Sequence, residues 1–166
     1  MADKIFLGLG SNKGDRLYFL KKTVAELQSF NVNIVNYSSV YETIPYGNKE
    51  QKNFYNAVVE VSSSLTIDNL FNLIKRLEKQ LGRKESKEKW APREIDIDIL
   101  FYNQLIYKSD KLNIPHPGIL ERDFVMIPLL EIDKNFFHPI EKKELFQFDL
   151  KSIEKHIIQK LEYSLS

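Results

Sequence analysis

Four stretches of the chain have the polarity pattern of β-strands. Residues 54–62 and 95–102 alternate between two kinds of position, a period of two that is typical of a strand with two different faces. Residues 4–9 form a short apolar run, which predicts a buried strand, and residues 32–43 are rich in Val, Ile, Tyr and Ser. We expect residues 32–43 to form one long strand.

Apolar residues recur at intervals of three and four between these strands, which predicts amphipathic helices. The first helix is expected over about residues 15–30, with Asp15 as its N-cap. The second is expected to begin at Thr66 and to stop at Gly82. Residues 8–12, Gly-Leu-Gly-Ser-Asn, predict a turn between the first strand and the first helix.

The last third of the chain predicts a hairpin and more helices. Residues 103–104 favour a tight turn, with residues 105–107 as the hairpin partner of the preceding strand. A helix is expected over 122–132, shortened or bent by Pro128, and an amphipathic helix over 150–161. The order β-α-β-β-α-β, an added hairpin strand and C-terminal helices predict a ferredoxin-like α+β fold. Its antiparallel sheet would pack helices on one face and leave the other for a site.

Composition limits the kinds of function. The 166 residues, 43% hydrophobic and 28% charged, predict one domain over residues 1–166 with a proper core. A net charge of +1 speaks against nucleic acid as a partner, and the lack of cysteine excludes disulfides and thiolate chemistry. Because the first apolar run is too short for a signal peptide or a membrane span, we expect a cytoplasmic protein. We also expect the protein to be a monomer.

Asp96 and Asp98 are the strongest chemical signal. In a strand, residues i and i+2 share a face about 6.6 Å apart, so the two carboxylates would stand side by side next to Leu100. Like charges this close need a partner, and oxygen ligands suit Mg²⁺ completed by waters and substrate phosphates. Taken alone, the pair fits the solvated face of a half-exposed sheet equally well.

The segment before this pair favours the metal interpretation. Lys87, Lys89 and Arg93 precede the carboxylates, together with Trp90 and Pro92. Paired acids beside cations are what metal-assisted phosphate chemistry requires. The residues themselves therefore predict Mg²⁺ and a polyphosphate, and no more than that.

Two further groups of residues are candidates for binding. Phe54 and Asn56 share one face of their strand, where they would stack on and hydrogen-bond a flat heterocycle; the alternative is a core phenylalanine and a strand-end asparagine. His116, between two prolines, is expected to be ordered and is a candidate phosphate contact. His138 and His156 are expected at the surface.

Taken together, these motifs resemble the 6-hydroxymethyl-7,8-dihydropterin pyrophosphokinase family of folate biosynthesis over about residues 5–139. The matching motifs are Gly10-Ser11-Asn12, Val40-Tyr41-Glu42-Thr43 with Pro45 and Gly47, Phe54-Tyr55-Asn56-Ala57, Glu78 with Gly82-Arg83, Trp90-Ala91-Pro92-Arg93 followed by Asp96-Ile97-Asp98-Ile99-Leu100, and Pro115-His116-Pro117 with Arg122 and Phe124.

The resemblance implies transfer of pyrophosphate from ATP to the dihydropterin, with release of AMP. It implies two Mg²⁺ ions bound by Asp96 and Asp98, which with Arg83 and Arg93 would be the catalytic residues. The implied ATP contacts are Glu78, Arg83, Lys89, Arg93, Ile99, His116 and Arg122. The implied pterin contacts are Thr43, Pro45, Tyr46, Phe54, Asn56, Trp90, Arg93, Asp96 and Phe124.

Some positions depart from common family members, and two other functions compete. Lys89 stands where arginine is frequent and lacks its planar fork, Phe54 replaces a frequent tyrosine, and Glu85 adds an acid to a loop that is often more basic. A nucleotidyl transferase also pairs acids with cations, but it releases pyrophosphate rather than AMP. A ferredoxin-like RNA-binding module has no use for two acids on its open face.

Overall fold

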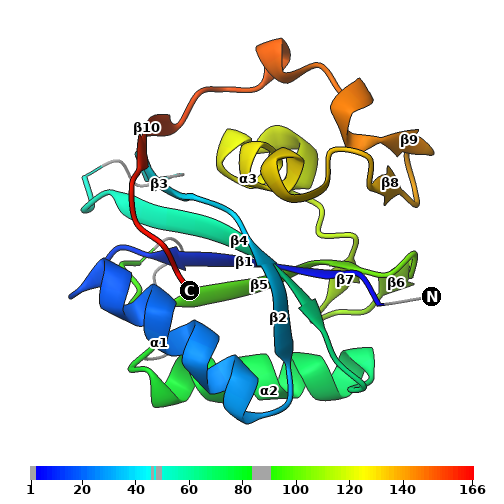
Figure 1. Ribbon diagram of the computed structural model, residues 1–166. Helices are drawn as coiled ribbons and strands as arrows, with labels where there is room; N and C mark the ends of the chain where they lie inside the picture. Colours follow the sequence, from blue (N-terminus) through cyan, green and yellow to red (C-terminus); the bar gives the residue numbers. More distant parts are fainter. Residues whose placement is uncertain (1–2, 46, 48–49, 84–90) are drawn as a thin grey trace.

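The computed structural model describes residues 3–45, 47, 50–83 and 91–166 and is built around one antiparallel sheet (Figure 1). The strands of this sheet are β1 (Ile5–Ser11), β2 (Asn33–Tyr37), β3 (Val40–Thr43), β4 (Phe54–Ser62), β5 (Asp96–Tyr102) and β10 (Ile157–Leu161). Their order is β10-β3-β4-β1-β5, and β2 also pairs with β4. The sequence order β1-α1-β2/β3-β4-α2-β5 is the expected ferredoxin-like core.

Three α-helices of the described residues accompany the sheet. They are α1 (Arg16–Ser29), α2 (Ile67–Gln80) and α3 (Asp123–Asp133). The predicted caps are confirmed, because the side chains of Asp15 and Thr66 accept hydrogen bonds from the main chain of the first turns. Pro128 lies inside α3 without ending it. Within the described part of the chain, no helix is long and apolar enough to cross a membrane.

The remaining elements are short. Two small sheets pair β6 (Tyr107–Lys108) with β7 (Asn113–Ile114), and β8 (Phe137–His138) with β9 (Lys143–Glu144). Three 3₁₀ turns cover Ile119–Glu121, Leu145–Gln147 and Leu150–Ser152.

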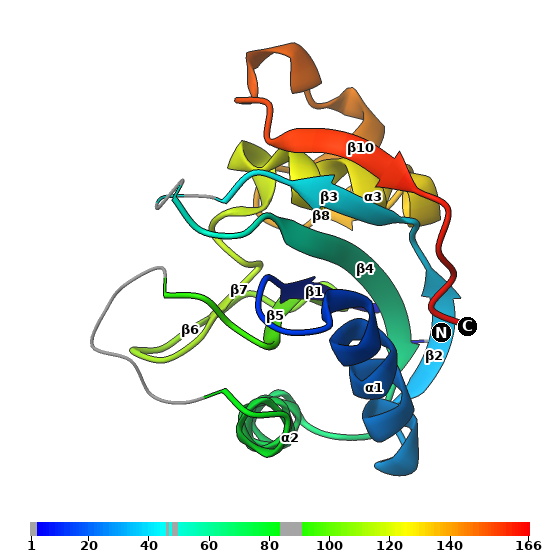
Figure 2. The same cartoon turned by 90° about the vertical axis from the view of Figure 1, so that its left-hand side faces the viewer.

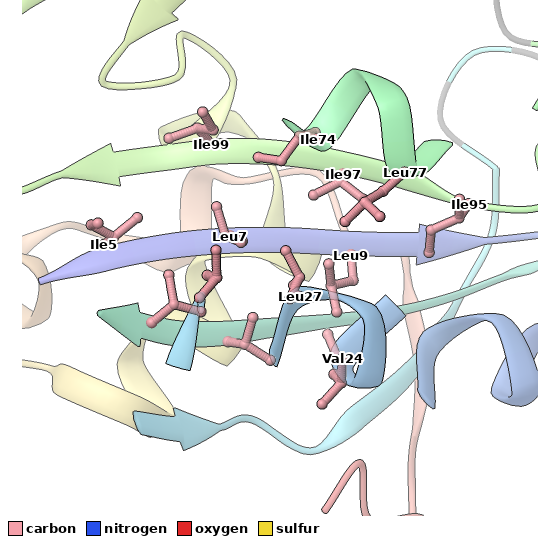
Figure 3. Packing of buried hydrophobic residues seen from close by; sticks show 14 of the residues in the cluster. Ile5, Leu7, Leu9, Val24, Leu27, Ile74, Leu77, Ile95, Ile97 and Ile99 are labelled. Atoms are coloured by element: carbon pink, nitrogen blue, oxygen red, sulfur yellow. The ribbon is translucent and has the colours of Figure 1, made fainter. Parts of the chain in front are cut away.

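Each face of the sheet has its own hydrophobic core. Helices α1 and α2 cover one face, where Ile95, just before β5, and Ile97 and Ile99 of β5 pack with Ile74 and Leu77 of α2 (Figures 1 and 3). Helix α3 lies across part of the other face. The alternating strands feed both cores, because successive side chains point to opposite sides.

The expectation that helices lie on only one face is therefore wrong. On the second face, Phe6, Val58 and Leu100 are buried together with Met126 and Leu129 of α3. These apolar strand residues would otherwise be exposed to water, and covering them stabilises the fold. The open part of this face is left beside α3, and it holds the pocket described below.

The single long strand predicted over 32–43 is interrupted at Ser38 and Ser39. The Ser38 main chain donates to the Val58 carbonyl at 2.9 Å, and its hydroxyl accepts from the Val58 N–H at 2.8 Å. The Ser39 main chain and hydroxyl both donate to the Glu131 carboxylate of α3. These contacts satisfy the backbone at the break, so β2 and β3 pair with successive parts of β4.

We expect Glu131→Gln to lower the Tm by about 2–4 °C at pH 7, or roughly 1 kcal/mol after allowing for partial exposure. Burial raises the pKa of Glu131, but hydrogen bonds from the Ser39 main chain and hydroxyl and from Lys160 outweigh it and lower the pKa. A depressed carboxyl pKa stabilises the fold above the unfolded-state pKa, and this contribution is lost as pH falls through the folded-state value. The difference between variant and wild type should therefore shrink below pH 4.5 in thermal melts. The exposed Glu162→Gln is the control, and a pH-independent difference would contradict the assignment.

Two local predictions near the strand ends are wrong. Residues 8–12 are not a turn, because β1 continues through both glycines to Ser11. Residues 105–107 do not pair with β5; Tyr107 pairs with Ile114 instead, after Asn103 turns the chain with φ 51°. The left-handed conformation at Asn103 directs the chain away from β5.

The amphipathic helix predicted over 150–161 is also wrong. Only Leu150–Ser152 forms a helical turn, and residues 157–161 form β10, which pairs with β3. The edge of β3 offers unpaired backbone groups, and pairing them outweighs a helical spacing of apolar residues. The C-terminal part of the fold is therefore α3 followed by a strand, not a set of helices.

Candidate active site

A pocket opens on the α3 side of the sheet, where four strands and one helix contribute side chains. It brings together most of the described residues that the sequence predicted for a site. The predicted residues that line it are Thr43, Phe54, Asn56, Arg93, Asp96, Asp98, Arg122 and Phe124. Three predicted contacts, Tyr46, Lys89 and Trp90, lie outside the described residues. Glu85 and Lys87 lie outside them as well. Pro45 is buried next to Ile44, which lines the pocket.

Asp96 and Asp98 both face this pocket, as the alternation of β5 predicted. One oxygen of Asp96, Oδ1, accepts from Nη1 of Arg83 at 3.1 Å and from Nη1 of Arg93 at 3.0 Å. The Asp98 side chain keeps 37% of its area exposed, and its Oδ2 lies 3.9 Å from Nε2 of His116. Asp96 is thus paired with two arginines, whereas Asp98 lies near a histidine and is partly exposed.

Protonation differs between Asp98 and its neighbours. Burial, and then the negative charge of Asp96, raise the pKa of Asp98 to about 7, although Arg122 acts in the opposite direction. Burial and Arg122 lower the pKa of His116 to about 4, so its imidazole is neutral at pH 7. The Gly118 N–H donates to Nδ1 of His116 at 3.0 Å, which places the proton on Nε2, toward the pocket.

The donor set fits Mg²⁺ that shares its ligands with a phosphate. Carboxylate oxygens are hard ligands, and Mg²⁺ is usually held by one or two of them while waters and phosphates complete its shell. Burial and the charge of Asp96 raise the pKa of Asp98, and a cation bound between the carboxylates would act against both effects. Among the described residues, no group of three or more His, Cys, Asp or Glu side chains forms a complete metal cage.

Glu78 supports the site from beneath the sheet and does not line the pocket. Its buried carboxylate accepts from the Ile97 N–H at 3.1 Å, from Lys75 at 3.1 Å and from Arg83. Burial, and then Asp96, raise its pKa. Glu78 therefore holds both Arg83 and the start of β5 in place.

Arg83 and His116 do not line the pocket either, but each is held next to one of its carboxylates, Arg83 at Asp96 and His116 at Asp98. Ile99, a further predicted ATP contact, lies elsewhere. It is buried in the core against α2, on the face of β5 opposite to the carboxylates. Only its main chain is available to a ligand on the pocket side.

The pterin-contact candidates form a second, more apolar part of the pocket. Phe54 of β4 and Phe124 of α3 supply aromatic faces, and the Asn56 side-chain N–H donates to the Thr43 hydroxyl at 2.7 Å. Gly10 of β1 lies opposite Asn56 of β4, and a Cβ at this position would be 2.6 Å from Asn56 Oδ1. The glycine that was predicted to form a turn instead makes room for this amide in the sheet.

Asn12 is a site residue to which the sequence analysis gave no role. Its main chain donates to the Arg93 carbonyl at 3.0 Å, and its side-chain oxygen accepts from the Arg93 N–H at 2.8 Å. Its amide also donates to the Gln51 side chain at 2.8 Å and to the Lys52 carbonyl at 3.2 Å. Asn12 therefore links the segments before β4 and β5. The feature of the sequence that could have pointed to Asn12 was its position directly after β1, a strand that contains two glycines.

His138 and His156, expected at the surface, are both buried. The ring of His138 packs edge-on against Phe101 with a centroid distance of 5.3 Å. The ring of His156 packs edge-on against Phe124 at 5.8 Å. Tertiary packing against Phe101 and Phe124, both distant in the sequence, buries the two rings.

Comparison with known proteins agrees with the resemblance seen in the sequence. A family model described as 7,8-dihydro-6-hydroxymethylpterin-pyrophosphokinase matches residues 6–134. A protein of Aquifex aeolicus named 2-amino-4-hydroxy-6-hydroxymethyldihydropteridine pyrophosphokinase is 45% identical over 144 residues, which are 87% of this chain and 89% of the relative. A relative of the same name from Bacillus subtilis is 41% identical over 133 residues, 80% of this chain and 79% of the relative.

Solved structures support the fold independently. The Plasmodium falciparum HPPK-DHPS solved with pterin and p-hydroxybenzoate has a TM-score of 0.66 and 18% identity, covering 88% of this chain and 42% of that chain. Because the identity is low, this likeness supports the architecture alone. The pocket residues, the matched family model and the relatives of near-equal length together show that the chain belongs to the 7,8-dihydro-6-hydroxymethylpterin-pyrophosphokinase family.

Proposed function

We propose that this pyrophosphokinase of folate biosynthesis transfers pyrophosphate from ATP to the 6-hydroxymethyl group of 6-hydroxymethyl-7,8-dihydropterin and releases AMP. The observation that carries the proposal is a pocket with two distinct parts. Asp96 and Asp98 stand among arginines in one part, while Phe54 and Phe124 offer aromatic faces in the other. This pairing suits one ligand with a polyphosphate and one with a flat ring.

The apolar part of the pocket is proposed to bind the pterin. Phe54 and Phe124 would stack on the ring, and Asn56 and Thr43, already hydrogen-bonded to each other, would read its polar edge. The other proposed pterin contacts are Pro45, Tyr46, Trp90, Arg93 and Asp96.

The charged part of the pocket is proposed to bind ATP. Arg83, Arg93 and Arg122 would contact the phosphates, with Lys89 and the Nε2 proton of His116. The contacts described above favour an indirect role for Glu78, through Arg83, and a main-chain role for Ile99.

Asp96 and Asp98 are the proposed ligands of two Mg²⁺ ions. When bound, the ions would neutralise the phosphates and the carboxylates and polarise the transferred group. Asp96 would also orient the attacking hydroxyl. The hydroxyl oxygen would bond to the β-phosphorus as the bond from that phosphorus to the α–β bridging oxygen breaks. AMP would leave with the bridging oxygen, and the hydroxyl proton would be released to solvent. Arg83 and Arg93, both held on Asp96, would supply positive charge to the transferred group.

One assay tests the reaction directly. Purified protein is incubated with Mg-ATP, with and without the hydroxymethyl dihydropterin, and nucleotide products are separated. AMP that forms only when the pterin is present supports the proposal. Release of pyrophosphate with transfer of AMP to the acceptor would identify a nucleotidyl transferase and overturn it.

We also propose that residues 1–166 form one pyrophosphokinase domain that acts as a monomer. In support, cores on both faces of one sheet draw on residues from all parts of the described chain. Sedimentation equilibrium of the active protein should give the mass of one 19.5 kDa chain. A dimer that persists at assay concentrations would contradict the monomer.

We expect Gly10→Ala to raise the KM for the pterin at least about tenfold. The added methyl group would lie 2.6 Å from Asn56 Oδ1, so the amide must move or the strands must separate. Overpacking of this kind costs about 1–3 kcal/mol, or about 5- to 150-fold in binding. Because a 2.6 Å contact requires a shift of the amide or the strand, we expect at least about 1.4 kcal/mol, which is tenfold. Steady-state kinetics at saturating Mg-ATP measure the effect.

Gly8→Ala is the matched control for this change. It lies two residues earlier on the same strand, and its added Cβ would meet Leu100 at an ordinary 3.5 Å. Its effect on the pterin KM should be several-fold smaller. Equal increases in the pterin KM of the two variants would show that the glycines are needed for the strand itself and not to make room for Asn56.

A further inference from the structure

The C-terminal strand extends the sheet beside the pocket, although it lies beyond residues 6–134 that the family model matches. After the turn at Leu150–Ser152 the chain returns to the sheet edge, where β10 lies alongside β3 (Figure 2). Their register places Ile157 opposite Thr43, which lines the pocket. The segment before β10 is thus close to two walls of the pocket.

The main chain of His156 joins these two walls. Its N–H donates to Asp123 Oδ2 at 2.8 Å, and the next N–H, of Ile157, donates to the same oxygen at 2.9 Å. Its carbonyl accepts from the Ile44 N–H at 3.0 Å. Asp123 is a buried residue at the start of α3, and hydrogen bonds to a carboxylate are strong. His156 therefore fixes the start of α3 relative to the end of β3.

The imidazole of His156 supports the aromatic wall itself. The ring is only 3% exposed and packs edge-on against Phe124, with centroids 5.8 Å apart and an interplanar angle of 77°. Its Nδ1 lies 3.1 Å from the Glu154 carbonyl oxygen, which can only accept, so this contact holds the ring in orientation. Phe124 in turn lines the pocket.

We propose that His156 is a positioning residue for the pterin, which holds the Phe124 ring in the orientation needed for stacking. This inference rests on the proposed function, since the ligand stacked on Phe124 is the pterin of that proposal. Edge-to-face contacts constrain ring orientation, and a pre-positioned ring spares the ligand the cost of ordering it. Loss of the His156 ring should therefore weaken pterin binding and leave the phosphate part of the pocket unaffected.

His156→Leu tests the proposal, because leucine fills apolar volume without an aromatic ring. At saturating Mg-ATP, the pterin KM should rise about three- to tenfold, the range expected for one aromatic pair. The kcat and the KM for ATP should stay within about twofold of wild type. His156→Phe, which retains a ring edge against Phe124, should return the pterin KM to within about twofold.

His138→Leu is the control for a general loss of stability. His138 is similarly buried and packs edge-on against Phe101, but it does not line the pocket. This variant should lower the Tm to a similar extent and leave the pterin KM unchanged. In a Phe124→Leu background, adding His156→Leu should have no further effect on the pterin KM, because the ring it positions is gone.

The possible results separate this inference from the proposed function. An unchanged pterin KM in His156→Leu, or an equal rise in His138→Leu, would overturn the positioning role while wild type still makes AMP. Wild type that makes no AMP would overturn the proposed function instead. Should His156→Leu not fold, His156→Gln, which keeps an N–H donor but lacks the ring, carries the same expectation for the pterin KM.

Discussion

Asp98→Asn is expected to lower turnover about 10²–10³-fold, the loss typical of removing one electrostatic stabiliser, while raising the Tm of the metal-free protein. Asparagine keeps the size of the side chain but removes one charge and a strong Mg²⁺ ligand. Asp98 faces the pocket beside Asp96, and the repulsion between them has no metal to relieve it in chelator. Function and stability should therefore change in opposite directions.

The stability gain has a defined pH dependence. Burial and Asp96 raise the pKa of folded Asp98 from 3.8 to about 7. A carboxyl whose pKa is raised on folding destabilises the fold fully above the folded value, and this penalty disappears as pH falls toward the unfolded value. In chelator, the Tm gain of Asp98→Asn should thus be largest at pH 8 and should shrink toward pH 5. Because the side chain is 37% exposed and solvent screens the charges, we expect about 2–4 °C at pH 8, or ~1 kcal/mol.

Two measurements complete this test. Mg²⁺ with a non-hydrolysable ATP analogue should raise the Tm of wild type more than that of Asp98→Asn, because ligands stabilise the state that binds them. Asp110→Asn, at an exposed position away from the pocket, should change neither turnover nor Tm. A variant that melts below wild type in chelator and still turns over normally would show that Asp98 is structural and that the metal proposal is wrong.

Arg93→Ala should lower kcat/KM by about 10³-fold, at the lower end of the effect of a catalytic arginine in phosphoryl transfer. The guanidinium of Arg93 binds Asp96 at 3.0 Å inside the pocket. Asn12 holds the main chain of Arg93 on both its N–H and its carbonyl, so the side chain starts from a fixed point. Such prior positioning of charge contributes most when the transition state forms.

Arg76→Ala provides the matched comparison. Arg76 is an exposed arginine of α2, stacked over the ring of Phe30 on the face of the sheet that α1 and α2 cover. Steady-state kinetics should show less than a twofold change for this variant, since exposed charges contribute little. Arg93→Lys should recover only part of the activity, because lysine lacks the planar fork. Comparable losses for Arg93→Ala and Arg76→Ala would refute a specific role for Arg93.

Local rules were enough to predict the parts of the fold that depend on local contacts. The cap at Asp15 accepts a hydrogen bond from Tyr18, three residues away, and the cap at Thr66 accepts one from Asn69. The faces of β4 and β5 followed from a period of two. The interruption at Ser39 could not be predicted in this way, since it depends on Glu131, 92 residues further along the chain.

The C-terminal segment shows how two patterns compete. Apolar residues at 150, 153, 157 and 161 fit a helix, and nothing nearby in the sequence contradicts it. The outcome depends on the free edge of β3, more than a hundred residues earlier, which takes up residues 157–161 as a strand. A sequence pattern cannot show which distant backbone groups remain unpaired.

The same difference between local and distant contacts applies to the candidate site. Asp96 and Asp98 were predictable because one strand presents both, and Arg93 lies within three residues of Asp96. Asn12 and His156 were not, because their partners Arg93 and Asp123 lie 81 and 33 residues away. Chemistry carried by neighbouring residues is visible in a sequence, whereas support that is assembled by the fold is visible only in the structure.

The two-sided character of β5 also limits how the length of the gene can change. Deleting or inserting one codon within the strand would move the remaining residues to the opposite face, so carboxylates would point at α2 and isoleucines into the pocket. Substitutions change one side chain, but a one-residue length change would remove both the core and the chemistry at once. Tolerated insertions should instead accumulate in exposed turns such as residues 109–112, where added residues shift no register in the main sheet.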